Sequence, residues 1–241
     1  CDAHDSASRG CENLNQRGTY ELRTVVHQSL ATLHRFSRVR GYRRVETNAH
    51  RRALVRSTWL RWLEAYRTVT TWFTSDPHWG HANIIRYCSR PFADVDKMHH
   101  ELRERWNACV AGGDEVWVLG DFVFGSVEWG AQILASLAGT KHLITGNHDR
   151  HRPSKYIEMG FATARQAHKL WVGDMHLQLQ HRPPPLDQNP PKLITLCGHV
   201  HERWVWSKQT RTLNVGVDVW GFAPVRADVV VNRIRHELRS A

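Results

Sequence analysis

The 241-residue sequence predicts an α/β domain, on two observations. From residue 69 to residue 145, short apolar runs alternate with stretches of helical periodicity, and a glycine closes each unit. After residue 160 the segments become short and strand-like, which predicts further sheet with partly antiparallel pairing. Hydrophobic residues make up 41% of the chain and charged residues 23%, which excludes collagen-like, disordered and membrane-embedded chains.

The first half of the domain is predicted to alternate strands with helices. A buried strand over 69–74 leads into a loop over 75–80. A helix over 94–110 follows, with Asp94 as its N-cap and apolar residues at steps of four. The remaining elements of this half are a strand over 116–119, a helix over 127–137 and a strand over 142–145.

The second half is predicted to be richer in sheet. Gly173 and Asp174 have the composition of a hairpin turn between two of its strands. The expected elements are strands over 161–164, 169–172, 176–181, 193–197, 204–207 and 212–217, and a last helix over 227–238.

Positive charge is concentrated at the start of the chain. The formal net charge is +10, and residues 1–69 carry +7 of it through 13 Arg, no Lys and 6 acidic residues. We expect this segment to be an Arg-rich extension, weakly helical or disordered, and residues 70–241 to form the domain. A basic arm that binds nucleic acid is the alternative interpretation.

Cysteine usage and hydropathy indicate the cellular compartment that we expect for the protein. The five cysteines are an odd number and include no C-x-x-C pair, so we expect reduced thiols rather than a disulfide framework or a thiolate zinc site. No apolar run approaches the roughly 20 residues that cross a bilayer, and the first ten residues lack the apolar core of an export signal. A cytoplasmic protein with no membrane partner is the expectation.

Five of the predicted strands lead directly into side chains that can bind a metal. Loops at the carboxyl ends of strands gather functional groups at one edge of an α/β fold. Imidazole, carboxylate and amide oxygen together suit Mn, Fe or Zn. A set of this size is too large for one ion and fits two ions that share a carboxylate. The residues are Asp76 and His78, then Asp121, then Asn147 and His148, then His181, then His199 and His201.

Five blocks of residues, in this order, resemble the signature of the calcineurin-like metallophosphoesterases. The resemblance spans about residues 70–220 and implies a four-layer αββα sandwich of two mixed β-sheets flanked by helices. The stretches 81–92 and 214–220 resemble the small bacterial and phage branch, whose members are known only as predicted phosphoesterases. The five blocks are Thr74–His81, Leu119–Asp121, Gly146–Asp149, His181–Pro183 and Gly198–His201.

The resemblance also implies roles for individual residues. His148 matches the candidate general acid of the family, and Asp149 is a candidate to orient it by a hydrogen bond. The implied metal ligands are Asp76, His78 and His201 for one ion, Asn147, His181 and His199 for the other, and Asp121 as the bridge.

Two positions differ from relatives of this family. Asp121 is followed by Phe122-Val123-Phe124 instead of the Asp-Arg-Gly turn of protein Ser/Thr phosphatases, which argues against that activity. His181 is followed by Arg182 and prolines instead of Tyr-Pro, so the substrate-facing rim is expected to differ there. His176 is a rival for the role of His181, but it points to the other face of its strand.

Together these features predict a dinuclear metal-dependent phosphoesterase that hydrolyses a phosphate mono- or diester with a metal-activated hydroxide. Manganese is the favoured ion, with Fe, Zn, Ni and Co as alternatives. The expected substrate is a phosphorylated small molecule or a nucleotide. One alternative is a nucleotide pyrophosphate hydrolase on the same metal core, and another is a scaffold without catalysis. The candidate substrate contacts are Asn83, Arg86, Arg90 and Arg182.

Overall fold

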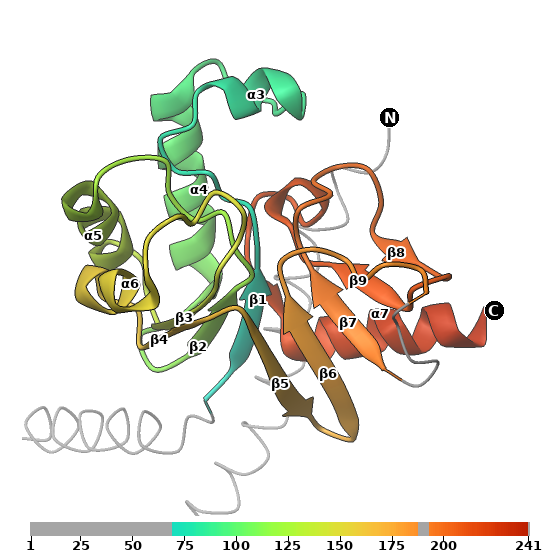
Figure 1. Ribbon diagram of the computed structural model, residues 1–241. Helices are drawn as coiled ribbons and strands as arrows, with labels where there is room; N and C mark the ends of the chain where they lie inside the picture. The colour runs from blue at the N-terminus through green and yellow to red at the C-terminus, as the bar shows by residue number, and fades with distance from the viewer. Residues whose placement is uncertain (1–68, 188–192, 241) are drawn as a thin grey trace, which may run out of the picture. The chain divides into compact units, whose positions relative to one another are not determined.

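Two five-stranded mixed sheets pack against each other in the computed structural model, which describes residues 69–187 and 193–240. Helices flank the sheets (Figure 1). The α/β class and the sandwich of two mixed sheets are therefore confirmed. The Arg-rich segment expected over residues 1–69 lies, except for Val69, outside the described residues.

The first sheet has the strand order β10-β1-β2-β3-β4. Its strands β1 to β4 are parallel, and β10 pairs with β1 in the antiparallel direction. The carboxyl ends of β1, β2 and β3 therefore open on the same edge of the sheet. The strands are β1 Thr71–Thr74, β2 Glu115–Val118, β3 Thr140–Ile144, β4 Thr163–Arg165 and β10 Val225–Arg226.

The second sheet has the order β5-β6-β7-β9-β8. Strands β6, β7 and β9 are parallel, and both edge strands are antiparallel to their neighbours. Val172 pairs with Met175 across the Gly173-Asp174 turn, which confirms the predicted hairpin. The strands are β5 Ala167–Val172, β6 Met175–Gln180, β7 Ile194–Cys197, β8 Trp206–Ser207 and β9 Thr212–Asn214.

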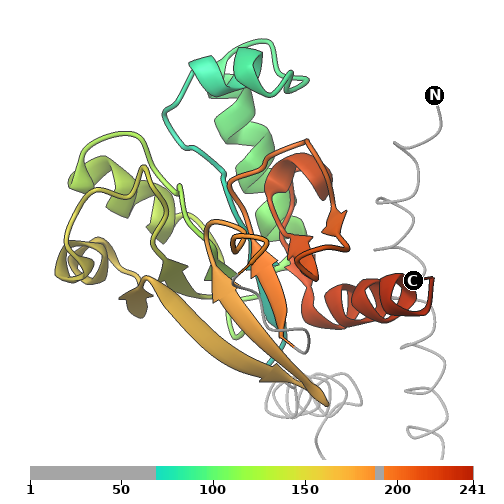
Figure 2. The ribbon, with the colours of Figure 1, turned by 45° about the vertical axis from the view of Figure 1, so that its right-hand side comes forward.

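Helices cover the outer face of the first sheet. Alternate residues of β1 and β2, such as Trp72 and Val116, pack there against Met98 and Trp106 of α4. The Asp94 side chain caps α4 by accepting a hydrogen bond from the Lys97 amide at 2.7 Å. Figure 2 shows the short helix α3 at one end of α4. The helices are α3 Asn83–Tyr87, α4 Val95–Cys109, α5 Val127–Ala135, α6 Pro153–Met159 and α7 Ala227–Arg239, with a 3-10 turn at Val217–Val219.

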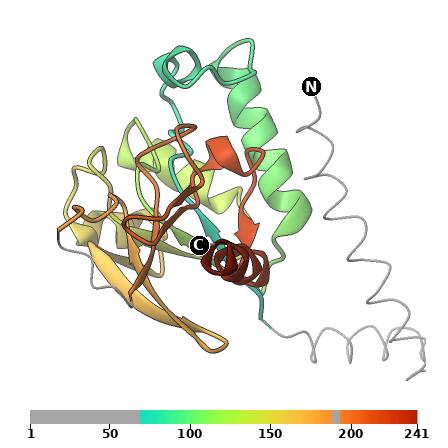
Figure 3. The same cartoon turned by 90° about the vertical axis from the view of Figure 1, so that its right-hand side faces the viewer.

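A second core lies between the two sheets. The other alternate residues of the first sheet, such as Phe73, pack here against Leu177 and Leu196 of the second sheet. Helix α7, seen end-on in Figure 3, adds Val230 and Ile234 to the same core. Burying each such side chain contributes about 1.5–3 kcal/mol. This core fixes the strands, and therefore fixes where their carboxyl ends lie.

Two helices were not predicted from the sequence. Helix α6 carries recognisable signals, since Pro153 stands at its start and Gly160, at φ 119°, ends it in the left-handed conformation. Helix α3 has five residues and no side-chain cap, so the sequence holds little to detect. None of the helices in the described part of the chain combines the length and hydropathy of a membrane span.

Candidate metal centre

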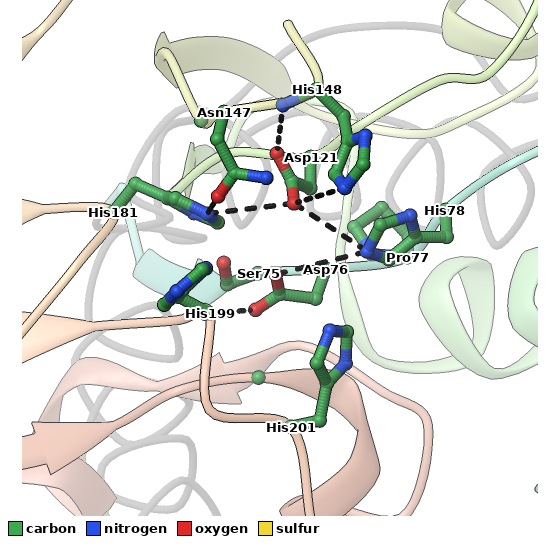
Figure 4. Close-up of polar contacts among 12 residues, drawn as sticks. Ser75, Asp76, Pro77, His78, Asp121, Asn147, His148, His181, His199 and His201 are labelled. Atoms are coloured by element: carbon green, nitrogen blue, oxygen red, sulfur yellow. Dashed lines mark hydrogen bonds and ion pairs between the residues drawn. The ribbon is translucent and has the colours of Figure 1, made fainter. Parts of the chain in front are cut away.

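The carboxyl ends of β1, β2 and β3 in the first sheet and of β6 and β7 in the second meet at one place, where the candidate ligands converge (Figure 4). Several contacts join the ligand-bearing loops of the two sheets. The His199 amide donates to Asp76 Oδ2 at 2.9 Å, and His181 Nδ1 lies 2.8 Å from the carbonyl oxygen of Leu119. The side chains gathered there are Asp76, His78, Asp121, Asn147, His148, His181, His199 and His201.

Asp121 lies between two groups of histidines. Its Oδ1 accepts a hydrogen bond from the His148 amide at 2.8 Å. Its Oδ2 lies 3.6 Å from His78 Nε2 and 3.5 Å from His181 Nε2. Burial raises the pKa of this carboxyl, but His181, the His148 amide and His78 together outweigh burial and lower the pKa to about 2. The carboxylate is thus held ionised, with one oxygen facing ring nitrogens on two sides.

One group consists of Asp76, His78 and His201, whose ligand atoms lie within 4.8 Å of one another. Asp76 Oδ1 and His78 Nε2 are 4.0 Å apart, and both are buried without a hydrogen-bond partner. Leaving such atoms unpaired is costly, and a cation between them would remove the cost. Burial lowers the pKa of His78 to about 2, so its ring is neutral, which is the form that binds metals.

The other group contains His181, Asn147 and His199. The contact with the Leu119 carbonyl requires a proton on His181 Nδ1, so Nε2 is the atom that faces the centre. His181 Nε2 lies 3.0 Å from Asn147 Oδ1, and the His199 ring centroid is 5.1 Å from that of His181. Burial lowers the pKa of His181, but Asp121 and Asp76 more than offset this and raise it to about 9. Burial lowers the pKa of His199 to about 4.

The backbone is strained where it presents these side chains. Eight non-glycine residues in the described ranges have positive φ, and five of them are candidate ligands. Strain of this kind, at about 1–3 kcal/mol per residue, concentrates at functional sites. A Cβ at Gly198 would overlap Ser75 Oγ and Asp76 Oδ2. The five ligands and their φ angles are Asp76 (56°), His78 (52°), Asp121 (52°), His199 (69°) and His201 (49°).

A buried ion pair between Arg90 and Asp218 contacts the group of Asp76, His78 and His201. Asp218 Oδ2 lies 3.0 Å from His201 Nδ1, and the Asp218 carboxylate accepts two bonds from Arg90, at 2.8 and 3.0 Å. Arg90 also donates to the carbonyl oxygens of Asp76 at 2.7 Å and Pro77 at 3.1 Å. The prediction that Arg90 contacts substrate is therefore wrong, because Arg90 is 4% exposed and these internal acceptors occupy its guanidinium.

Asp149 does not orient His148, contrary to the expectation from sequence. Its buried carboxylate accepts hydrogen bonds from the amides of Gly146, Asp121 and Phe122, at 2.7, 2.8 and 3.2 Å. Adjacent residues point in different directions here, so Asp149 fixes the Asp121 loop instead. His148 Nε2 lies 4.0 Å from Asp121 Oδ2, and its side chain is 32% exposed. Its Nδ1 is buried without a partner.

The remaining candidate substrate contacts are exposed. Asn83 and Arg86 lie on α3, and the Arg86 guanidinium is 5.5 Å from the centre of the Tyr87 ring. The charge of Arg182 contributes to the lowered pKa of His199. His176, the rival of His181, instead stacks on Trp171 with 4.6 Å between centroids.

Cys88, His201 and Asp218 form a further group whose ligand atoms lie close together. Burial raises the pKa of the Cys88 thiol to about 12, which keeps the thiol protonated and poorly suited to bind a metal. Asp218 is already bonded to Arg90 and His201. This group therefore supports the His201 ring and adds no separate site.

Sequence reasoning missed Asp218 and His81 in this region. Asp218 lies in the 214–220 stretch, but its partner Arg90 is 128 residues away along the chain. His81 Nδ1 lies 3.4 Å from His78 Nδ1, so His81 can hold the His78 ring with Nε2 toward Asp121. His81 belongs to the first block and to the 81–92 stretch, and these were the signals for it in the sequence.

Comparison with known proteins identifies relatives, but their names say little about function. The Gene 66 protein of Mycobacterium phage D29 is 33% identical over 180 residues, which cover 62% of this chain and 88% of the phage protein. An uncharacterized protein of Methanocaldococcus jannaschii is 29% identical over 174 residues, covering 66% and 88%. A solved protein of unknown function from Aquifex aeolicus has a TM-score of 0.55 and 18% identity, covering 68% of this chain and 99% of its own. No protein-family model matches the chain.

The phage relative establishes kinship over most of its length, and the Aquifex structure shares the fold. The five sequence blocks lie at the strand ends of a two-sheet sandwich, where their acidic and histidine side chains converge. The chain therefore belongs to the family that includes the phage Gene 66 proteins, and its five blocks take the places in the fold that their resemblance to the calcineurin-like metallophosphoesterases implies.

Proposed function

We propose that this protein is a metal-dependent phosphoesterase with a dinuclear centre. One observation carries the proposal: Asp121 Oδ2 lies between His78 Nε2 and His181 Nε2, at 3.6 and 3.5 Å. A carboxylate oxygen in this position can bridge two ions, and Asp76 Oδ1 offers a second unpaired oxygen on one side.

The seven ligands divide between two positions that share Asp121. Bound there, two divalent ions would neutralise phosphoryl oxygens and lower the pKa of an attacking water toward about 7. The donor set is imidazole, carboxylate and amide, and manganese is the first ion to test. The first position takes Asp76, His78 and His201, and the second takes Asn147, His181 and His199.

His148 is the proposed general acid. Its Nε2 faces the centre 4.0 Å from Asp121 Oδ2, while about a third of its side chain is exposed. A proton on Nε2 can therefore reach a leaving oxygen at the mouth of the site. General acids in such positions contribute about 100-fold to 10,000-fold in rate. Asn83, Arg86 and Arg182 are the proposed contacts to the rest of a phosphate mono- or diester.

The test is an activity screen of the full-length protein with manganese, using p-nitrophenyl phosphate as monoester and bis-p-nitrophenyl phosphate as diester. Hydrolysis that a chelator abolishes and manganese restores is expected. His176→Ala is the matched histidine control and should keep the wild-type rate. Metal-loaded protein that hydrolyses neither ester would refute the proposed function.

A further inference from the structure

A row of aromatic rings leads from the candidate metal centre to the surface. The His81 ring stacks on Phe124, with centroids 4.6 Å apart and planes at 15°. Tyr87 meets the His81 ring edge-on at 6.1 Å. Phe124 is 45% exposed and Tyr87 60% exposed. We call His81, Tyr87 and Phe124 the aromatic shelf. Exposed rings beside a polar site are a recognisable ligand surface.

Backbone contacts hold the shelf in place. The Phe124 amide donates to the Trp79 carbonyl at 2.6 Å, and the Trp79 amide donates to the Phe122 carbonyl at 3.0 Å. Gly80 has φ 84°, and a Cβ there would overlap the carbonyl oxygen of Phe124. The loops that carry His81 and Phe124 are thus joined side by side. A ring that stacks on the shelf would meet a surface that is already ordered, which favours binding.

The shelf begins at the proposed general acid. The His148 ring centroid lies 5.4 Å from that of Phe124 and 6.3 Å from that of His81. A leaving group whose oxygen takes the proton from His148 Nε2 therefore lies beside Phe124. Its more distant part can reach Tyr87, where the exposed Arg86 guanidinium adds positive charge. Aromatic side chains next to an arginine are a common platform for nucleobases.

We infer that the aromatic shelf stacks the nucleobase of a nucleoside phosphate, with the nucleoside as the leaving group. The orientation of the ligand, with its phosphate toward the metal centre and its base on the shelf, rests on the proposed phosphoesterase function. Phosphate esters whose leaving group carries a planar base are then preferred over esters of similar charge without a ring. Phe124 contributes most, because it lies nearest to His148, and Tyr87 contributes at the outer end.

The first test compares hydrolysis of adenosine 5′-monophosphate with that of glycerol 2-phosphate by the manganese-loaded full-length protein. Phe124→Ala should raise KM for the nucleotide about tenfold, as loss of one stacked base does elsewhere, and change kcat/KM for glycerol phosphate less than twofold. Ile157→Ala is the matched control, since Ile157 is 46% exposed on α6, outside the shelf, and should change neither value. Equal loss for both substrates in Phe124→Ala, or no loss for the nucleotide, would overturn the inference.

The second test needs no turnover. Adenosine, which has no phosphate, is titrated into the protein and followed by NMR, with ribose as the ligand without a base. Adenosine should bind more tightly than ribose, and Phe124→Ala and Tyr87→Ala should weaken its binding severalfold while Ile157→Ala does not. If the protein hydrolyses no ester but adenosine binds as described, the phosphoesterase proposal fails and the stacking site stands. If adenosine binds no better than ribose, the stacking site fails, whatever the activity.

Discussion

The floor and the rim of the candidate metal centre are built in different ways. The floor consists of Asp76, His78 and Asp121, which are buried at strand ends and presented by left-handed backbone. The rim consists of His148, Phe124 and Tyr87, which lie on loops or a short helix and are partly exposed. The floor is therefore suited to hold ions in a fixed geometry, and the rim is suited to select what approaches them.

The difference also decides how substitutions should act. A floor residue is buried among other polar and charged side chains. Its loss therefore leaves those side chains buried without a compensating charge or hydrogen bond. A rim residue faces solvent on one side, so its loss removes one contact and leaves the fold intact. We expect effects on metal content from the floor, and effects on turnover or substrate choice from the rim.

The largest effect is expected for Asp121→Asn. The amide keeps an oxygen for the His148 N–H but removes the negative charge that faces His78 and His181. Metal content should fall below two ions per chain, and kcat/KM for p-nitrophenyl phosphate should fall by at least about 1000-fold. Elemental analysis and kinetics measure the two effects. Asp187→Asn, at an exposed carboxylate, is the control, and equal results for both variants would contradict a bridging role.

The next effect is expected for His148→Ala. Metal content should stay at the wild-type value, because His148 is not a proposed ligand, while kcat falls about 100-fold to 10,000-fold. Substrates with more acidic leaving groups need less protonation, so p-nitrophenyl esters should lose less than alkyl esters. A uniform loss across leaving groups, or a loss of metal, would show that His148 acts in another way.

A smaller effect on metal binding is expected for Asp218→Asn. This change removes the acceptor charge beside His201 Nδ1 and leaves Arg90 partly uncompensated. Substitutions of this kind weaken metal affinity about 10-fold to 100-fold. Calorimetric titration with manganese should show weakening at one of the two positions. Both positions weakened alike, or neither weakened, would contradict the assignment of His201 to one ion only.

One further effect needs no substitution, and it is a pH dependence of metal affinity. In the apoprotein the pKa of His181 is about 9, because Asp121 and Asp76 outweigh the effect of burial. A metal ion at Nε2 must replace the proton that His181 holds below that pH. Affinity at this position should therefore rise as pH increases from 6 to 8.5, by up to about tenfold per unit. Titrations that give the same affinity across this range would contradict His181 as a ligand.

The floor was predictable from the sequence, and its supports were not. Asp76, His78 and Asp121 follow short apolar runs, and parallel strands bring such positions to one edge. Arg90 was assigned to substrate because an arginine near a phosphate site suits that role, but its partner Asp218 is 128 residues away. Asp149 shows the same limit, since adjacency to His148 in sequence does not give the direction of a side chain.

Secondary structure was likewise predictable where the signal is local, and not where it depends on contacts between distant residues. The helix predicted from Asp94 and the hairpin at Gly173 were correct, because a cap and a turn residue are local signals. The strand predicted to reach residue 217 ends at Asn214. There the Asn214 side chain bonds to the carbonyls of His201 and Trp204, contacts that arise only in the folded chain.

The central claim is that two ions share Asp121, and anomalous diffraction from crystals of the manganese-loaded full-length protein tests it directly. We predict two manganese peaks roughly 3.5–4 Å apart, one on each side of Asp121 Oδ2. One peak should contact Asp76, His78 and His201, and the other Asn147, His181 and His199. A single peak, or peaks away from these side chains, would contradict the account.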